Sequence, residues 1–287
     1  MDSLEKQVFV AHLSMIPKGT DSLLREIVFL CTVNIVTEII KYRWNAKGRH
    51  GTHSPFVYAF TDECQRIPMD IEVVEGLKSI ESLCKSSSEV IEVNDQGVGS
   101  HRLSNQRKVR DIYRVSSSKG KFGRLLFQIS RYYSPKNILE FGTSLGVGTY
   151  CMAKGNPEGN VVTIDACANT QAVARRMLES AKVENCTLIN STFDEYLSQN
   201  PREIFDLVFI DGHHDGVSLL RYLDALKNNS HDDTIFILDD IRWSVSMFDA
   251  WQKIIADPKY HVTMDFFRMG MVVRRPQQRK EHFVVKV

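Results

Sequence analysis

Short apolar runs alternate with helical patterns over the second half of the chain. Within each run the apolar residues are continuous, which is typical of strands buried on both faces of a sheet. The pattern therefore predicts a doubly wound α/β domain, with a mostly parallel sheet between two layers of helices. Sheets of this kind bind ligands at the carboxyl ends of their strands. The expected strands cover residues 137–141, 161–165, 186–190, 207–211 and 234–239.

Three further apolar runs follow near the end of the chain, at 262–267, 271–274 and 282–287. They lie close together without helical segments between them, which predicts antiparallel pairing. We therefore expect a seven-stranded sheet with an antiparallel C-terminal edge.

The first half of the chain has helical apolar spacing from Leu23 to Leu83, with one break at 45–55 where glycines and a proline stop helices. The segment from Leu23 to Ile40 carries charged residues, which predicts an amphipathic helix rather than a membrane span. Such a helix would cover the core or pair with a second copy in a homodimer. Basic residues and glycines between Lys85 and Lys121 predict a flexible loop. Residues 1–115 are thus expected to form a helical cap with a basic loop, and residues 116–287 the ligand-binding core.

Composition narrows the functional classes. The chain has 43% hydrophobic residues, and its 36 Lys and Arg residues nearly balance 35 Asp and Glu residues. A net charge of +1 gives no field that attracts nucleic acid or an anionic membrane, so neither partner is expected. The six cysteines are scattered singly, and the first residues lack the basic and apolar pattern of a secretory signal. We expect a cytoplasmic protein with reduced thiols.

The sharpest feature is residues 138–149, where a strand runs into glycines and then a helix. Gly142 and Gly146 let a ligand approach the backbone, and the helix start presents unpaired N–H groups. A nucleotide-like ligand follows, with tight packing as the alternative. The GxGxxG order of dinucleotide folds is absent, and Glu140 at the strand tip would repel a phosphate.

Two later strand ends offer further polar groups. Asp165 lies 25 residues after Glu140, where α/β nucleotide folds place an acid that binds ribose hydroxyls. Its alternative role is to cap the next helix. Thr192 and Phe193 follow the third strand and suit an adenine ring, although the threonine could equally cap a helix.

These residues resemble class I S-adenosylmethionine-dependent methyltransferases, which have a Rossmann-like fold. Glu140, the glycine turn and Asp165 carry the resemblance, which covers residues 122–287. Within this family the segments 123–146 and 208–214 are most similar to small-molecule O-methyltransferases of the catechol type. The motif at 48–55 also resembles a group of bacterial methyltransferases.

The resemblance implies a role for each matching position. The methionine end of S-adenosylmethionine would be held by Glu140 and the turn, and its ribose by Asp165 with Ala166. Its adenine would be held by Thr192 and Phe193. Asp211 would lie at the mouth of the active site, where it would contact the cofactor and act as a catalytic residue. The residues expected in the turn are Gly142, Thr143, Ser144, Gly146 and Gly148.

The resemblance also suggests a metal site and a base. Metal-dependent members bind Mg²⁺ through an acid at the position of Asp211 and an Asp-Asn pair after the fifth strand. Here Asp239 and Asp240 stand at that pair, and three carboxylates suit a hard divalent cation. His214 falls where the catechol-type enzymes have a lysine base, and an imidazole can accept a hydroxyl proton at neutral pH. Whether His213 or His214 is the base stays open.

The sequence thus predicts methyl transfer from S-adenosylmethionine to an oxygen of a small acceptor, with a divalent cation as an optional aid. If the basic loop folds over the site, Arg107, Lys108 and Arg110 favour an anionic acceptor. Two alternatives stay open: an NAD-linked oxidoreductase, and a non-catalytic nucleotide-binding protein that acts through its helical half.

Overall fold

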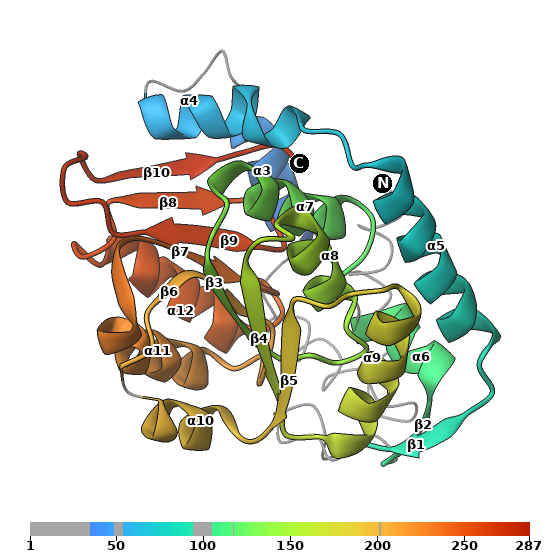
Figure 1. The fold of residues 1–287 in the computed structure, drawn as a ribbon. Coiled ribbons are helices and arrows are strands. Elements are labelled where there is room, and N and C mark those ends of the chain that lie inside the picture. Colours follow the sequence, from blue (N-terminus) through green and yellow to red (C-terminus); the bar gives the residue numbers. More distant parts are fainter. Residues whose placement is uncertain (1–34, 49–53, 94–104, 117, 201) are drawn as a thin grey trace, which may run out of the picture.

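An eight-stranded sheet lies at the centre of the chain, in the order β10-β8-β9-β7-β6-β3-β4-β5 (Figure 1). The computed structural model describes residues 35–48, 54–93, 105–116, 118–200 and 202–287. The strands are β3 (Asn137–Phe141), β4 (Asn160–Asp165), β5 (Cys186–Asn190), β6 (Phe205–Ile210), β7 (Ser230–Leu238), β8 (Val262–Asp265), β9 (Gly270–Val273) and β10 (Glu281–Val284).

The five predicted core strands are present and run parallel, with β3 between β4 and β6. The predicted antiparallel pairing at the C-terminal end is confirmed for β9, which pairs with both β7 and β8. It is wrong for β10, which pairs in parallel with β8. Because β9 is paired on both sides, β10 can only extend the free edge of β8, and it makes the sheet eight-stranded rather than seven-stranded.

Helices cover both faces of the sheet, as the continuous apolar strands predict. One face carries α7 (Lys121–Tyr133), α8 (Val147–Gly155) and α9 (Ala168–Ser180). The other carries α10 (Phe193–Gln199), α11 (Gly216–Ala225), the 3₁₀ helix η4 (Leu226–Asn229) and α12 (Val245–Ala256). The Rossmann-like three-layer architecture is therefore confirmed.

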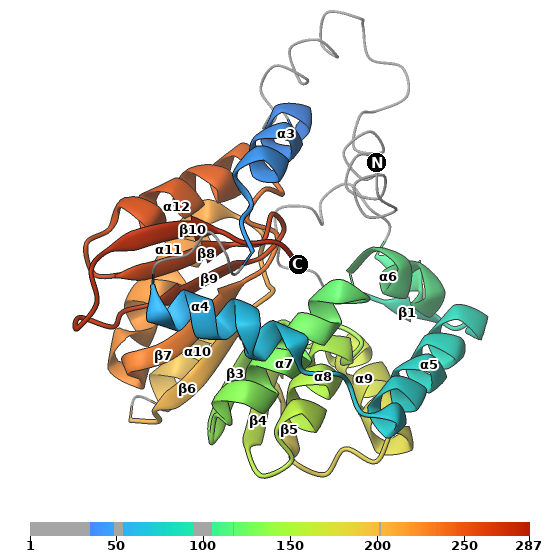
Figure 2. The same cartoon turned by 90° about the horizontal axis from the view of Figure 1, so that it is seen from above.

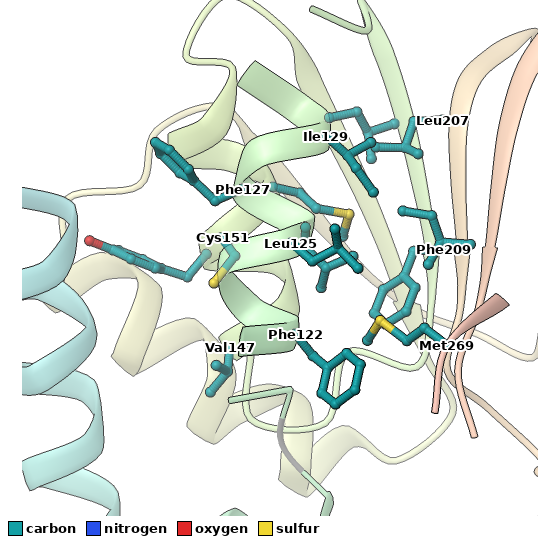
Figure 3. Close-up of a cluster of buried hydrophobic side chains, with 14 of the residues drawn as sticks. Phe122, Leu125, Phe127, Ile129, Val147, Cys151, Leu207, Phe209 and Met269 are labelled. Atoms are coloured by element: carbon teal, nitrogen blue, oxygen red, sulfur yellow. The ribbon is translucent and has the colours of Figure 1, made fainter. Parts of the chain in front are cut away.

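The packing of α7 shows how the apolar pattern fixes a helix on the sheet. Leu125 and Ile129, four residues apart on one face of α7, are fully buried and lie toward Leu207 and Phe209 of β6 (Figure 3). Phe122 is fully buried at the start of the same helix. Each such side chain contributes about 1.5–3 kcal/mol by leaving water.

The helices of the first half are α3 (Ile35–Asn45), α4 (Pro55–Asp62), the 3₁₀ helix η2 (Cys64–Arg66), α5 (Ile71–Ser86) and α6 (Val109–Ser116). All of them except α3 contribute residues to the same hydrophobic cluster as α7 and α8, and α3 lies beside α12 (Figure 2). In α5 the residue Gly76 leaves room for Tyr150 of α8, whose hydroxyl donates to the carbonyl of Val73 at 3.1 Å. The helical first half is therefore confirmed where it is described.

Helix α3 forms the described end of the predicted amphipathic helix, whose residues 23–34 lie outside the described part of the chain. Glu38 is buried and pairs with Arg242, whereas Ile40 is 60% exposed. No helix within the described ranges is long and apolar enough to cross a membrane.

The predicted flexible basic loop is wrong for the residues that the structure describes. β1 (Val90–Glu92) pairs with β2 (Gln106–Lys108) in an antiparallel ribbon, and α6 follows directly. Glu89 accepts from Arg176 of α9 at 2.9 and 2.7 Å, and the carbonyl of Glu92 accepts from Asn169 at 2.7 Å. Charge masked an apolar spacing at 109, 112 and 113, all buried here. Residues 94–104 of that predicted loop lie outside the described part.

Candidate active site

The carboxyl ends of β3, β4, β6 and β7 meet at one edge of the sheet, as expected for parallel strands. Backbone bonds extend the ladder by one residue beyond the strands: Gly142 donates to Ile164 at 2.9 Å, and Asp211 donates to Phe141 at 2.8 Å. The N–H of Asp239 donates to the carbonyl of Ile210 at 2.9 Å. The structure therefore brings the turn after β3 together with three predicted site residues from other strand ends: Asp165, Asp211 and Asp239.

Two glycines in the turn after β3 are required by the backbone. Gly142 has φ +102°, and a Cβ there would lie 2.2 Å from the carbonyl oxygen of Asp211. Gly146 has φ +80° and begins α8 as its N-cap. The turn therefore packs tightly against the residue that follows β6, as the packing alternative expects, and it ends at the start of a helix. We call the turn and this helix start the cradle, where backbone N–H groups would face a nucleotide-like cofactor.

Glu140 lies behind this turn rather than inside it. Its side chain is 1% exposed and accepts a short hydrogen bond from the hydroxyl of Thr149 on α8. Gly148 passes so close that a Cβ there would lie 2.7 Å from Glu140 Oε1. Burial raises the pKa of Glu140 to about 7. Glu140 therefore joins β3 to α8 through its hydrogen bond with Thr149.

Asp165 joins the turns that follow β3 and β4. Its Oδ2 accepts the N–H of Ser144 at 2.9 Å, and its Oδ1 accepts the N–H of Cys167 at 2.8 Å. Cys167 is the N-cap residue of α9, so Asp165 supports this helix start from two positions before the cap. Ala166 lies half-buried between them. The hydroxyl of Thr170 also donates to Oδ1, at 3.5 Å, so both oxygens of Asp165 have partners within the chain.

At the end of β5 the helix-capping alternative is confirmed for Thr192. Its side chain accepts the N–H of Glu195 and forms a capping box with that residue. Phe193 is buried and stacks on Phe141 with ring centroids 4.4 Å apart. One face of its ring is therefore occupied by the core.

Three carboxylates and one arginine form the acidic cluster, which we define as Asp211, Asp239, Asp240 and Arg268. Arg268 holds both oxygens of Asp239, with Nε to Oδ1 at 3.0 Å and Nη2 to Oδ2 at 2.6 Å. Its Nε also lies 3.0 Å from Oδ1 of Asp240. The cation in this cluster is thus supplied by the chain itself.

Burial and mutual repulsion shape the protonation of the cluster. Burial, with the carboxylate of Asp239 beside it, raises the pKa of Asp211 well above its ordinary value. Burial also raises the pKa of Asp239, although Arg268 opposes the shift. Burial alone would lower the pKa of Arg268, but the surrounding carboxylates raise it. The guanidinium therefore stays charged, and Asp211 is the carboxyl most ready to hold a proton.

The predicted divalent cation does not fit these residues. Arg268 already occupies the space between Asp239 and Asp240, and it neutralises the carboxylates that would ligate the ion. Within the described part of the chain, no group of three or more His, Cys, Asp or Glu residues is arranged to hold a metal ion. The metal prediction from Asp211, Asp239 and Asp240 is therefore corrected. Sequence reasoning missed Arg268, whose only signal was a lone basic residue between two apolar runs.

The two histidines after β6 point to different surroundings. His214 lies with Nε2 4.0 Å from Oδ1 of Asp211 and Nδ1 3.8 Å from Oδ2 of Asp240. It is 34% exposed at the side chain. His213 instead has Nδ1 3.1 Å from the hydroxyl of Tyr222 and lies edge-on to Phe193. The geometry therefore favours His214 as the proton acceptor.

Known proteins are similar to this chain in sequence and in fold. Residues 139–241 match the profile of a family described as a methyltransferase domain. A catechol O-methyltransferase of Niastella koreensis is 30% identical over 132 residues, which cover 44% of this chain and 58% of that protein. The chain thus spans little more than half the length of this curated relative.

Solved structures agree in fold. The SAH-bound structure of a methyltransferase from Podospora anserina has a TM-score of 0.51 and 15% identity, covering 78% of this chain and 99% of that one. An O-methyltransferase of tomaymycin synthesis from Streptomyces achromogenes, in complex with SAM, has a TM-score of 0.51 and 13% identity, covering 73% and 92%. The resemblance to class I S-adenosylmethionine-dependent methyltransferases is thus supported at two levels: residues 139–241 match a methyltransferase family, and the solved structures share the Rossmann-like fold.

Proposed function

We propose that this domain transfers a methyl group from S-adenosylmethionine to an oxygen of a small acceptor. The observation that carries the proposal is the meeting of the cradle, Asp165 and Asp211 at one edge of the sheet. There Asp165 accepts the N–H of Ser144, and the N–H of Asp211 donates to Phe141. When bound, the cofactor supplies a methyl group on a sulfonium, and the protein supplies alignment with an oxygen nucleophile.

The residues around the cradle divide the cofactor between them. The methionine end would lie on the turn with Thr143, Ser144, Gly146 and Gly148, backed by Glu140. Asp165 would accept the ribose hydroxyls beside Ala166, in addition to its bonds within the chain. Thr192 and Phe193 would border the adenine at the start of α10, where Phe193 is 6% exposed.

His214 would take the proton of the acceptor hydroxyl. The oxygen–methyl bond would form as the sulfur–methyl bond of the bound cofactor breaks, which leaves S-adenosylhomocysteine as the second product. The proton of the broken oxygen–hydrogen bond would pass to the imidazole. Asp240, 3.8 Å from the ring, would stabilise the resulting imidazolium, whereas Asp211, 4.0 Å away, is the carboxyl more ready to hold a proton. These carboxylates disfavour a negative charge beside the reacting oxygen. Anionic groups on the acceptor, where present, would lie toward Arg107, Lys108 and Arg110 on β2 and α6.

The acceptor class follows from this chemistry and from the catechol O-methyltransferase relative: small molecules with a phenolic or similarly acidic hydroxyl. The test is incubation of the full chain with methyl-labelled S-adenosylmethionine and a panel of phenols, catechols and hydroxy acids. Label on a product oxygen supports the proposal. Cofactor binding without transfer to any acceptor favours the binding-protein alternative, and NAD binding favours the oxidoreductase.

A further inference from the structure

The carboxylates of the acidic cluster need a positive charge beside them because they are buried. Asp239 is 1% exposed, and the side chains of Asp211 and Asp240 are only 10% and 17% exposed. Carboxylates this close repel one another in a medium that screens charge poorly, so they require a counter-ion or protons. In this chain Arg268 supplies the positive charge. It lies in the turn between β8 and β9, whereas the three acids follow β6 and β7.

The arginine is held in place from both ends. Its carbonyl accepts the N–H of Ile241, the residue that follows Asp240, at 2.9 Å. Its guanidinium is 5.6 Å from the ring of Phe122 and its side chain is 15% exposed. Residues 239–241 therefore fix the backbone of Arg268 through Ile241, and they present the carboxylates of Asp239 and Asp240 to its side chain. A cation positioned in this way needs no capture from solution.

We propose that Arg268 is a built-in replacement for the divalent cation, and that it positions Asp239 and Asp240 for a metal-independent methyl transfer. The inference rests on the proposed function. A guanidinium engaged with two carboxylates does not chelate two acceptor oxygens as a metal ion does. A single hydroxyl is then sufficient in an acceptor, and proton removal falls to His214.

A second buried arginine supplies the comparison. Arg242 binds both oxygens of Asp265 at 2.9 and 2.8 Å and also contacts Glu38. This ion pair joins α3 to the C-terminal strands, and Arg242 itself lies two residues after Asp240. It matches Arg268 in burial and geometry, so it controls for the loss of a buried ion pair.

The experiment is calorimetric titration with Mn²⁺, combined with thermal unfolding in EDTA and in Mn²⁺. Wild type is expected to bind no Mn²⁺ and to keep the same Tm in both conditions. Arg268→Met leaves the three carboxylates without their cation and is expected to gain one Mn²⁺ site and a higher Tm in Mn²⁺. Arg268→Lys retains the charge and should gain no site. Arg242→Met should lose stability and gain no site.

Stoichiometric Mn²⁺ binding to wild type that disappears in Asp211→Asn would overturn the inference, and so would a folded Arg268→Met that gains no Mn²⁺ site. The wild-type titration decides the question if Arg268→Met does not fold. Kinetics give a second readout: Arg268→Met should lose kcat, with its affinity for S-adenosylmethionine unchanged, and regain turnover in Mn²⁺. Because Mn²⁺ binding is measured without S-adenosylmethionine, failure of the cofactor assignment would be seen separately.

Discussion

The N–H of Ser144 donates to Oδ2 of Asp165 at 2.9 Å, and this bond joins the turn after β3 to the turn after β4. The two turns come from adjacent parallel strands, so a ligand that lies across them touches both. The same carboxylate also accepts the N–H of Cys167 at the start of α9. Asp165 thus supports the fold and the proposed ribose site together.

Substitution of Asp165 should weaken cofactor binding, which the loss of an ordinary helix cap should not do. Asp165→Ala is expected to lose about 1–2 kcal/mol of unfolding free energy and at least about tenfold in affinity for S-adenosylhomocysteine. Asp215→Ala is the matched control, since Asp215 accepts the N–H groups of Val217 and Ser218 at the start of α11. It should lose similar stability and keep the affinity. Equal affinities in both variants would remove Asp165 from the site.

The cradle can be tested at Gly142. Gly142→Ala places a Cβ 2.2 Å from the carbonyl of Asp211, so the turn must shift and cofactor binding should be lost. Gly120→Ala is the control, because Gly120 also has positive φ, at +58°, but has open space for a Cβ. That control should cost about 1–3 kcal/mol of stability, from backbone strain alone, and leave binding unchanged. Titration of both variants checks the prediction, and full binding by Gly142→Ala would contradict it.

Glu140 should make stability depend on pH. Burial raises its pKa from 4.5 to about 7. Between these values the folded protein keeps a proton that the unfolded chain has lost, so the unfolding free energy falls as pH rises through this window. The contribution is on the order of 3 kcal/mol. Glu140→Gln cannot ionise, and its denaturant midpoint should fall less than that of wild type over the same window. Parallel pH profiles would show that Glu140 titrates normally.

His214 is expected to affect turnover and not cofactor affinity. His214→Gln should lower kcat by about 10²–10⁴-fold, the usual range for a general base, with the affinity for S-adenosylmethionine unchanged. His231→Gln is the control, because His231 pairs with Asp206 at the surface, near the amino ends of β6 and β7. Undiminished kcat in His214→Gln would pass the role to another group at the cluster.

The strand layer was accessible from sequence because burial on both faces leaves continuous apolar runs that few other elements produce. The direction of the edge strand β10 could not be predicted from sequence. It depends on which strand edge is left free once β9 has paired on both sides. Local pattern holds no such information. Charge likewise hid β1, β2 and α6, whose buried positions such as Ile112 lie among basic residues that stay in solvent.

The site divides in the same way. Strand-end residues such as Asp165 and Asp211 could be placed from sequence, because parallel strands deliver their carboxyl ends to one edge. Arg268 could not, since its contact with Asp239 spans 29 positions and is made across a turn between antiparallel strands. The metal prediction failed there because counting carboxylates leaves out the cation that tertiary structure brings to them.

Calorimetric titration of the full chain with S-adenosylmethionine and S-adenosylhomocysteine, with NAD in parallel, tests the central claim most directly. The account predicts micromolar binding of both sulfur cofactors, no binding of NAD, and identical affinities with and without Mg²⁺. Absence of binding by either sulfur cofactor would contradict the cofactor site at Gly142 and Asp165.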